Sequence, residues 1–399
     1  LSKATRDTMD DLFDLKLDGI PIPLPGTMID WEQIETSLFK PLFDQMKETP
    51  QNPSWHGEGD VWTHTRLVVE RLTELEEWKN ATDVVRAILF LAALLHDLGK
   101  PQATRWEDGK ITSAGHARIG TQLAREILWR QFDLAGTPEK QQVRETICSL
   151  IRFHSNPVHL LNEPRPDFSV LRSASEGDTV KLFTNKLLAT LVQADLSGRI
   201  ADNIDSSLEL LELFRVSAQE NKCYDAPFAF SSDISRLAYF SDRIDSPLID
   251  LYDETWGEVV LMSGLPGTGK DHWIETHGFD RPVISLDAIR EKLHVSPESQ
   301  QAPVLAFARE KAKEYLRTKT PFIWNATNLT KITRSPIIKL CLDYGASVRI
   351  VFLETSWSET LRRNANRKNV VPESVIGRLL EKLEPPKVRE AHRVEWHTT

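Results

Sequence analysis

The sequence has few cysteines and no long apolar segment. Only three cysteines occur among 399 residues, Cys148, Cys223 and Cys341. Their odd number and wide spacing argue against a disulfide framework and against a CxxC zinc finger. The longest apolar stretch, Ala87–Leu95, is too short to cross a bilayer, and no signal peptide is visible. With 40% hydrophobic residues, these absences predict a soluble cytoplasmic protein with ordinary globular cores and no membrane partner.

A surplus of basic charge is also missing from the chain as a whole. The 49 Lys+Arg and 58 Asp+Glu residues give a net charge of −9, which at first argues against a nucleic-acid partner. The charge is uneven, however. Residues 251–399 carry 22 Lys+Arg and 19 Asp+Glu, a charge of +3, whereas residues 1–250 carry −12. A −9 chain therefore excludes a salt-driven DNA binder better than it excludes an enzyme that holds a few end phosphates.

The first region of the chain, residues 1–225, has the pattern of a helical bundle. Apolar residues recur there at helical spacing and no strand alternation is visible. The helices predicted from this spacing are Thr63–Trp78, Val84–Leu95, Gly120–Phe132, Glu139–Phe153, Thr179–Leu196 and Ser206–Ser217. Turn signals separate them at Asp108-Gly109, Gly136–Pro138 and Asn162–Ser169.

The pattern changes after residue 225. Residues 226–256, interrupted by Pro227 and Pro247, predict a linker with some short structure. In residues 257–399 helical patterns alternate with short β-type runs at Glu258–Met262, Pro282–Ser285, Pro321–Trp324 and Ser347–Leu353. This alternation predicts a parallel α/β sheet. The expected fold class is therefore an all-α bundle followed by an α/β domain of the P-loop type.

A phosphate-binding loop follows the first of these strands. The run Gly264-Leu265-Pro266-Gly267-Thr268-Gly269-Lys270-Asp271 matches GxxxxGK between a strand and a helix. Glycines let backbone N–H groups surround phosphate oxygens, and the lysine reaches the transferred phosphoryl group. A glycine-rich turn without a ligand is the alternative, which the strand, the helix and the lysine together disfavour. Asp271 stands where Ser or Thr normally ligates Mg²⁺, and a carboxylate can also hold that ion.

A carboxylate and an arginine follow the second strand of this region. Asp287 can accept a proton from a substrate hydroxyl that attacks a γ-phosphate, and Arg290, one turn later, can hold an acceptor phosphate. Asp is equally a favoured helix N-cap, so spacing alone leaves both interpretations of Asp287 open. The basic cluster of Arg362, Arg363, Arg367 and Lys368 is equally compatible with a solvated helix face.

The segment from about Trp256 to Glu384 resembles the 5′-hydroxyl polynucleotide kinases of phage and bacterial RNA repair. The shared motifs, in order, are the loop ending in Lys270, Asp287-Ala288-Ile289-Arg290, Asn325-Ala326-Thr327-Asn328, and Arg363-Asn364-Ala365-Asn366-Arg367 before Val371-Pro372. The resemblance implies Asp287 as general base, Arg290 on the acceptor phosphate, and Arg363 and Arg367 as lid arginines on ATP or GTP bound with Mg²⁺. Asn325 occupies a strand-end position that is often Asp, so the carboxylate that organises Mg²⁺ has moved, by hypothesis, to Asp271.

The helical region carries histidines and aspartates that suit a metal. The apolar helix Val84–Leu95 ends in His96-Asp97, a costly pair to bury unless it is paired or coordinated. Further candidate ligands on or beside helical stretches are His64, His116, His154 and Asp195. Imidazoles with carboxylates and no thiolates suit Zn²⁺, Mn²⁺, Fe, Co²⁺ or Ni²⁺ rather than a structural zinc site. Any one of these histidines alone is more often a hydrogen-bonded core residue.

As an ordered set these residues resemble the HD-domain phosphohydrolases over about Trp55–Arg199, especially the HD domains of bacterial tRNA nucleotidyltransferases. The resemblance rests on His56–Thr65, His96–Lys100, Gly115-His116, His154 and Asp195–Arg199. It implies a metal core of His64, His96, Asp97 and Asp195, with His116 and His154 on a second metal or the substrate phosphate. Lys100 and Arg199 are then phosphate partners, and His56 is either a pocket residue or a surface loop residue.

Both halves together resemble the bacterial bifunctional HD–polynucleotide kinases. That resemblance implies removal of 2′- or 3′-phosphate or 2′,3′-cyclic phosphate ends and phosphorylation of 5′-hydroxyl ends of RNA or DNA, upstream of an RNA ligase. One alternative is a small-molecule or nucleotide kinase fused to a nucleotide phosphohydrolase. Another is a non-catalytic nucleotide sensor with an ATP switch, which Asp271 and Asn325 favour and the retained Asp287, Arg290 and Arg367 oppose.

Overall fold

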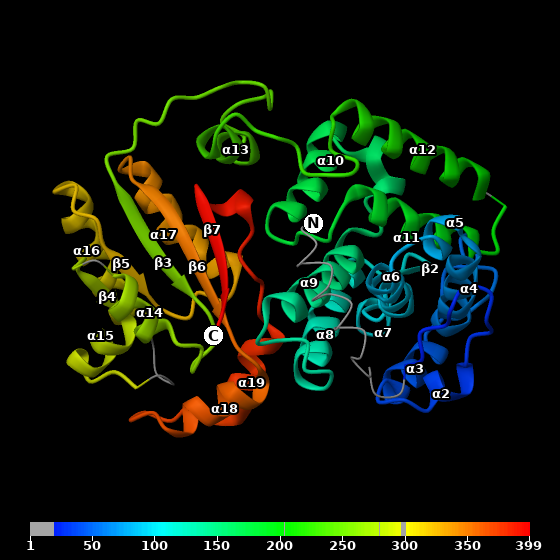
Figure 1. Cartoon of the computed structure of the whole chain (residues 1–399), viewed down its shortest axis with the longest axis horizontal. Helices are drawn as coiled ribbons and strands as arrows, with labels where there is room; N and C mark the ends of the chain where they lie inside the picture. Colours follow the sequence, from blue (N-terminus) through cyan, green and yellow to red (C-terminus); the bar gives the residue numbers. More distant parts are fainter. Residues whose placement is uncertain (1–19, 203, 279, 297–300) are drawn as a thin grey trace. The chain divides into compact units, whose positions relative to one another are not determined.

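The computed structural model describes residues 20–202, 204–278, 280–296 and 301–399. The chain divides into two compact units (Figure 1): the first comprises residues up to 134 and 138–228, and the second comprises 135–137 and 229–399. None of the described helices has both the length and the hydrophobicity of a membrane span.

The first unit is a bundle of helices. They are α2 (Trp31–Glu35), α3 (Lys40–Lys47), α4 (Val61–Glu74), α5 (Glu76–Lys79), α6 (Asp83–Leu95), α7 (Lys100–Ala103), α8 (His116–Arg130), α9 (Pro138–Phe153), α10 (Pro166–Ala174), α11 (Asn185–Ser197) and α12 (Ile204–Glu220), with short 3₁₀ turns η2 (Pro157–Asn162) and η3 (Ser175–Asp178). Helix α6 is the centre of the bundle, because every residue from Ile88 to Leu95 is buried and α4, α9 and α11 pack around it. The helix therefore carries the His96-Asp97 pair directly into the interior.

Three details of the first unit differ from the sequence prediction. Two short strands, β1 (Arg105–Glu107) and β2 (Lys110–Thr112), form an antiparallel hairpin where no strand was expected. The Asp108-Gly109 turn itself was predicted, and both residues have the positive φ of a tight turn, 49° and 75°. The strands beside it were missed because three residues are too few to show alternation. Helix α11 begins at Asn185, not Thr179, because Thr184 caps it, and helix α10 begins within the stretch expected to be a turn.

The second unit is built on a five-stranded parallel sheet. Its strands are β3 (Glu258–Ser263), β4 (Val283–Ser285), β5 (Ile323–Asn325), β6 (Ser347–Glu354) and β7 (Arg393–Thr398), in the order β4-β5-β3-β6-β7. Its helices are α13 (Asp233–Phe240), α14 (Lys270–His277), α15 (Leu286–Leu293), α16 (Ala302–Arg317), α17 (Lys331–Asp343), α18 (Trp357–Ala365) and α19 (Glu373–Glu381), with the 3₁₀ turn η4 (Val388–Glu390). A bundle followed by a parallel sheet confirms the predicted fold class.

The sheet is buried on both faces. Val259 and Leu261 of β3 pack with apolar residues of α15, α16 and α17, whereas Val260 and Met262 face α14. Two covered faces explain the near-continuous apolar runs by which the strands were recognised. Strand β7 was not predicted because Arg393–Thr398, at the sheet edge, contains only two apolar residues and none that is fully buried. The carboxyl ends of parallel strands share one edge of a sheet, where α/β folds place their ligands.

Candidate functional sites

A histidine–aspartate centre lies inside the helical bundle. His64 belongs to α4, His96 and Asp97 follow α6, His116 begins α8, His154 follows α9, and Asp195 belongs to α11. Gly99 permits this convergence, because a Cβ at that position would lie 2.1 Å from the carbonyl oxygen of His116 and 2.5 Å from the nitrogen of Gly120. The start of α8 can therefore approach the end of α6 closely.

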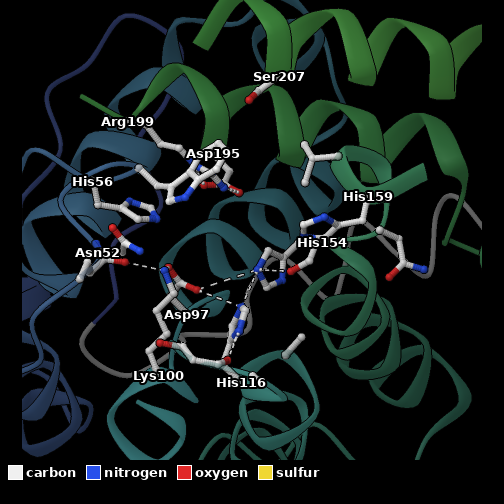
Figure 2. Close-up of a pocket in the computed structure, with 18 of the residues that line it drawn as sticks. Asn52, His56, Asp97, Lys100, His116, His154, His159, Asp195, Arg199 and Ser207 are labelled. Atoms are coloured by element: carbon white, nitrogen blue, oxygen red, sulfur yellow. Dashed lines mark hydrogen bonds and ion pairs between the residues drawn. The ribbon is translucent and has the colours of Figure 1, made fainter. Parts of the chain in front are cut away.

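The ligand atoms of the centre form two triads. In one, single nitrogen or oxygen atoms of His64, His96 and Asp195 lie within 4.8 Å of one another, and in the other those of Asp97, His116 and His154 do. The carboxylate of Asp97 connects them, since its Oδ2 is 3.1 Å from His96 Nε2 and its Oδ1 is 3.4 Å from His116 Nε2. Figure 2 shows Asp97 beside His116 and His154. The four predicted core ligands and the two auxiliary histidines thus occupy one centre.

The imidazoles are oriented by hydrogen bonds made at their other nitrogen. The Nδ1 atoms of His96, His116 and His154 each lie 2.8 Å from the carbonyl oxygen three residues earlier, those of Ala93, Ser113 and Ile151. A carbonyl only accepts, so each Nδ1 carries a proton and Nε2 is the nitrogen that faces the centre. This is the arrangement by which proteins orient histidine ligands.

The charges of the centre are balanced locally. Burial raises the pKa of Asp97, but the charges of His96 and Lys100 outweigh it and hold that pKa well below its usual range. Burial also raises the pKa of Asp195, but the charge of Arg199 and the hydrogen bond with His64 outweigh it and hold that pKa well below its usual range. Burial lowers the pKa of His154 to about 3. The aspartates are therefore anionic and His154 is neutral, as metal ligands must be.

The donor set fits divalent transition metals. It offers imidazole nitrogens and carboxylate oxygens without thiolates, the combination that such ions share. Asp97 Oδ1 and His96 Nε2 are buried, and neither atom has a hydrogen-bonding partner among the described residues. A buried polar atom without a partner costs free energy, which a coordinated cation would remove. Two adjacent triads joined by one carboxylate suit one metal or two.

Glu58 is a part of the centre that the sequence analysis did not single out. Its Oε1 lies 2.8 Å from both His64 Nδ1 and His56 Nδ1, and its Oε2 accepts a hydrogen bond from the backbone N–H of Ile200. Burial raises its pKa, but the hydrogen bonds from His56, His64 and Ile200 outweigh that effect and hold the pKa well below its usual range. Glu58 therefore orients the imidazole of His64 by contacting its Nδ1, the nitrogen that faces away from Asp195. His56 is a buried pocket residue rather than a surface residue.

The centre opens into a cavity of about 840 Å³. Lys100 lies in its wall, 2.7 Å from Asp97 Oδ2 and hydrogen-bonded to Gln51. Arg199 pairs with Asp195 at 2.8 Å. An ammonium has three donors and a guanidinium five, so both cations keep N–H groups for an anion bound beside the aspartates. Figure 2 shows Lys100 and Arg199 with Asp97 and Asp195 along the pocket wall.

The glycine-rich loop of the second unit joins β3 to α14. Gly264 has φ of 148°, and a Cβ there would lie 2.5 Å from the carbonyl oxygen of Leu353, so only glycine fits. The turn after β5 contacts the start of this loop. The side-chain amide of Asn328 donates to the carbonyl oxygen of Met262, and the N–H of Gly264 donates to the carbonyl oxygen of Thr327. The turn after β5 thus holds the loop open for phosphate.

Lys270 begins α14 and bends back over the loop. Its ammonium donates to the carbonyl oxygens of Gly264 and Leu265 at 2.9 and 2.7 Å. Burial lowers its pKa to about 8, and the positive charge of Arg367 acts in the same direction. The lysine is therefore held where the terminal phosphates of a nucleotide would lie.

The two departures from the loop pattern lie against each other. The side-chain amide of Asn325, at the end of β5, donates to Asp271 Oδ1 at 2.7 Å. A hydroxyl on the loop paired with a carboxylate at the strand end is the usual arrangement. Here the carboxylate is on the loop and the neutral group is on the strand, and both offer oxygens of the kind that Mg²⁺ prefers.

Asp287 lies in the first turn of α15 and is exposed. The N-cap interpretation of Asp287 is wrong, because Ser285 caps this helix and accepts from the N–H of Ala288. Arg290 pairs with Asp287 and also donates to Gln301 at 2.7 Å. The nearest Asp287 oxygen lies 3.8 Å from Arg367 Nη2. The carboxylate is thus exposed, ion-paired with Arg290 and flanked by Arg367.

The lid arginines lie at and beyond the end of α18. Arg363 donates to Thr399 Oγ1 at 2.9 Å, and its guanidinium comes close to Gly269 of the loop. Arg367 lies near Asp287 and Lys270. Arg362 points instead to solvent beside Glu359, and Lys368 pairs with Glu291 at the surface. Two of the four basic side chains therefore lie beside the loop, and the other two form the solvated face.

Comparison with known families adds to this geometry. Residues 61–180 match the model of the HD domain, and residues 259–386 match that of an AAA domain. The chain is a fusion of an HD domain and a P-loop AAA domain. Of the six side chains in the two triads, all but Asp195 lie within the residues that match the HD domain, and the glycine-rich loop lies within those that match the AAA domain.

Two curated relatives cover parts of the chain. A CC-adding tRNA nucleotidyltransferase of Thermus thermophilus is 32% identical over 133 residues, which are 33% of this chain and 28% of that protein. An L-seryl-tRNA(Sec) kinase of Methanococcus maripaludis is 24% identical over 140 residues, which are 33% of this chain and 55% of that protein. The chain therefore spans little more than a quarter of the first relative and about half of the second. Together they fit an HD domain joined to a kinase-type domain.

The order of residue types in the sequence predicted most of the side chains that the structure brings together at each site. Glu58 and Gln51 were missed because an acidic and an amide residue in a loop carry no signal of their own. Only their contacts with His64 and Lys100 reveal them. For Glu58, the one available signal was its place between two histidines, His56 and His64.

Proposed function

We propose that this chain heals broken RNA ends. The HD domain removes a 2′- or 3′-phosphate or opens a 2′,3′-cyclic phosphate, and the P-loop domain transfers the γ-phosphate of ATP or GTP to a 5′-hydroxyl. The observation that carries the proposal is that one chain contains both a buried histidine–aspartate centre and a glycine-rich loop with Lys270. The first has the residue types that metal-dependent phosphate hydrolysis needs, and the second has those that phosphoryl transfer needs. RNA as the common substrate is supported by the two relatives, whose names both contain tRNA.

In the HD domain the side chains would hold the reacting phosphate against the two triads. Metal bound there by His64, His96, Asp97, His116, His154 and Asp195 would supply a water that is acidic enough to attack near neutral pH. Lys100 and Arg199 would direct their spare N–H groups to the phosphate oxygens, since each already neutralises an aspartate beside them. Glu58 would keep the Nε2 atom of His64 turned toward the centre.

In the P-loop domain the catalytic groups would act on both sides of the transferred phosphoryl group. Lys270 would leave the carbonyls of Gly264 and Leu265 for the β- and γ-phosphates. Asp287 would take the proton of the attacking hydroxyl, with Arg290 on the phosphate next to it. Arg363 and Arg367 would neutralise the charge that develops on the nucleotide. Asp271 and Asn325 would hold Mg²⁺, which when bound neutralises negative charge on the phosphates.

The exposure of Asp287 supports the end of a polymer as the acceptor of the phosphoryl group. The side chain of Asp287 is 74% exposed, so the end of a polymer can reach it without entering a closed pocket. The resemblance to an L-seryl-tRNA(Sec) kinase favours a second candidate, in which the acceptor hydroxyl belongs to an aminoacyl group on tRNA rather than to a 5′ end.

One assay separates these possibilities. Labelled RNA with a 5′-hydroxyl and a 3′-phosphate is incubated with ATP, Mg²⁺ and each of Zn²⁺, Mn²⁺, Co²⁺, Ni²⁺ and Fe²⁺, beside seryl-tRNA and a mononucleoside. We expect a 5′-phosphate and a free 3′-hydroxyl on the RNA. Phosphorylation of the mononucleoside but not of the RNA would refute the proposal, and phosphorylation of seryl-tRNA alone would establish the second candidate.

A further inference from the structure

The HD cavity is larger than its two triads require. A reacting phosphate occupies only the part beside Asp97 and Asp195, yet the cavity holds about 840 Å³. Volumes of roughly 300–1,000 Å³ are typical of pockets that enclose whole small molecules. The remaining walls therefore have room for the nucleoside that bears the phosphate.

An exposed tryptophan forms part of these walls. Trp55 lines the cavity and is 46% exposed, and its indole makes no ring contact with any side chain that the structure describes. The turn that carries it is fixed, because the N–H groups of Trp55 and His56 donate to the carbonyl of Asn52 and that of Ser54 donates to its side chain. An aromatic ring held rigidly at a wet surface loses little entropy when it binds a flat ligand.

The cavity also has a surplus of positive charge within an acidic domain. Lys100 and Arg199 are matched by Asp97 and Asp195. A further arginine, Arg118, lines the same cavity. The guanidinium of Arg118 has no acidic partner in the described part of the chain. A surplus of this kind concentrates anions at the mouth of a cavity even where the net charge of the domain is negative.

We propose that the HD cavity contains a subsite for the end of a single-stranded polynucleotide, in which the terminal base stacks on Trp55 and the next phosphate contacts Arg118. The inference rests on the proposed phosphohydrolase function and names its substrate class. Bases of single-stranded nucleic acid are held in this way, by stacking on aromatic rings beside a basic groove. Among the described residues, neither side chain makes a hydrogen bond, ion pair or ring contact with a triad residue, so the subsite determines affinity for the substrate and not the chemistry of hydrolysis.

Two matched substrates test the stacking. Both are short RNA strands with a 3′-phosphate on a terminal residue that lacks the 2′-hydroxyl. One carries a terminal base, and the other carries a tetrahydrofuran abasic residue. Trp55→Ala should raise KM for the strand with the base about tenfold, as loss of one stacked base typically does, and should raise it far less for the abasic strand. Trp55→Phe should restore most of the affinity.

The outcomes separate the subsite from the proposed function. The matched control is Trp106→Ala, which removes a tryptophan that is 70% exposed and outside the cavity lining, and it should leave both KM values unchanged. If Trp55→Ala affects both strands equally, or neither, the subsite is refuted while the phosphohydrolase function stands. If the wild-type protein hydrolyses neither strand, and also no 2′-phosphate or 2′,3′-cyclic phosphate end, with any metal, the proposed function itself fails.

Arg118 is tested by the length of the substrate. Arg118→Ala should raise KM for a trinucleotide 3′-phosphate roughly fivefold and lower the salt dependence of that KM by about one phosphate contact. A mononucleoside 3′-phosphate has no second phosphate and should show little change. Equal effects on the two substrates would exclude Arg118 from the subsite.

Discussion

The two sites differ most in how far they are buried. In the HD domain the side chains of His64, Asp97 and Asp195 are 0%, 2% and 4% exposed, whereas Asp287 of the P-loop domain is 74% exposed. The first site is assembled by helix packing before any substrate arrives. The second lies on loops at the edge of a sheet, and nucleotide and acceptor must complete it.

This difference follows from what each site binds. Burying several charges is costly unless they are coordinated or paired, so the HD centre balances each aspartate with a cation or an imidazole. A P-loop binds its ligand largely through backbone N–H groups, which need only glycine geometry and a helix start. We therefore expect substitutions in the HD centre to affect metal binding, and those in the P-loop domain to affect phosphoryl transfer.

The largest effect is expected at Asp97, because it connects both triads. Asp97→Ala should lower phosphatase activity by at least about 10³-fold and reduce the bound metal, measured by elemental analysis. Kinase activity in the same preparation is the control and should be unchanged. Phosphatase activity within a few-fold of wild type would show that Asp97 is not part of the working centre.

Asp287→Ala tests the exposed site of the P-loop domain in the same way. Loss of the proposed general base should lower the kinase kcat by about 10²–10⁴-fold, with the KM for ATP and the phosphatase activity nearly unchanged. Asp287→Asn should be as inactive, because the amide keeps the shape of the side chain but accepts no proton. A normal kcat in either variant would refute the assignment.

The exchange of carboxylate and amide between Asp271 and Asn325 predicts a non-additive pair of substitutions. Asp271→Ser alone should weaken Mg²⁺-dependent ATP binding about tenfold. Asn325→Asp alone should also weaken it, because two carboxylates would meet across a contact that is now 2.7 Å. The double variant restores the usual arrangement and should recover most of the affinity, measured by titration calorimetry with and without Mg²⁺. Purely additive losses would contradict the exchange.

Glu58→Gln should weaken the HD domain without removing a ligand. Because an amide supports His64 less well than a carboxylate, metal affinity should fall about 10–100-fold, as measured by competition with a chelating dye. Glu74→Gln, on the same helix as His64 but exposed, is the matched control. Unchanged metal affinity in Glu58→Gln would mean that Glu58 serves only the packing of the loop.

The smallest effect expected is a pH dependence of ATP binding. Burial lowers the pKa of Lys270 to about 8, so its ammonium loses its proton as pH rises through that value. ATP affinity should fall up to about tenfold between pH 7 and 9. Lys270→Arg, which stays charged, should bind ATP with the same affinity at both pH values. The free energy of unfolding should rise with pH above 8, because the unfolded lysine then binds more protons than the folded one.

Much of this protein was predictable from local sequence. Helical spacing predicted the main helices of the bundle, apolar runs predicted four of the strands, and the glycine pattern with Lys270 predicted the phosphate loop, because each of these signals depends on neighbours in the chain. Strand β7 and the β1–β2 hairpin were missed, since β7 is a short edge strand with only two apolar residues and three-residue strands are too short to show a period.

Sequence order by itself predicted which histidines, aspartates and basic residues belong to the two sites, because the ordered set is far more specific than any one of these residues alone. Only the tertiary structure decided how they act. It divided six candidate metal ligands into two triads that Asp97 connects, placed Glu58 beside His64 Nδ1, paired Asp271 with Asn325, and assigned the cap of α15 to Ser285 instead of Asp287. These are contacts between residues distant in the chain, or choices between neighbouring residues, which packing settles and sequence pattern does not.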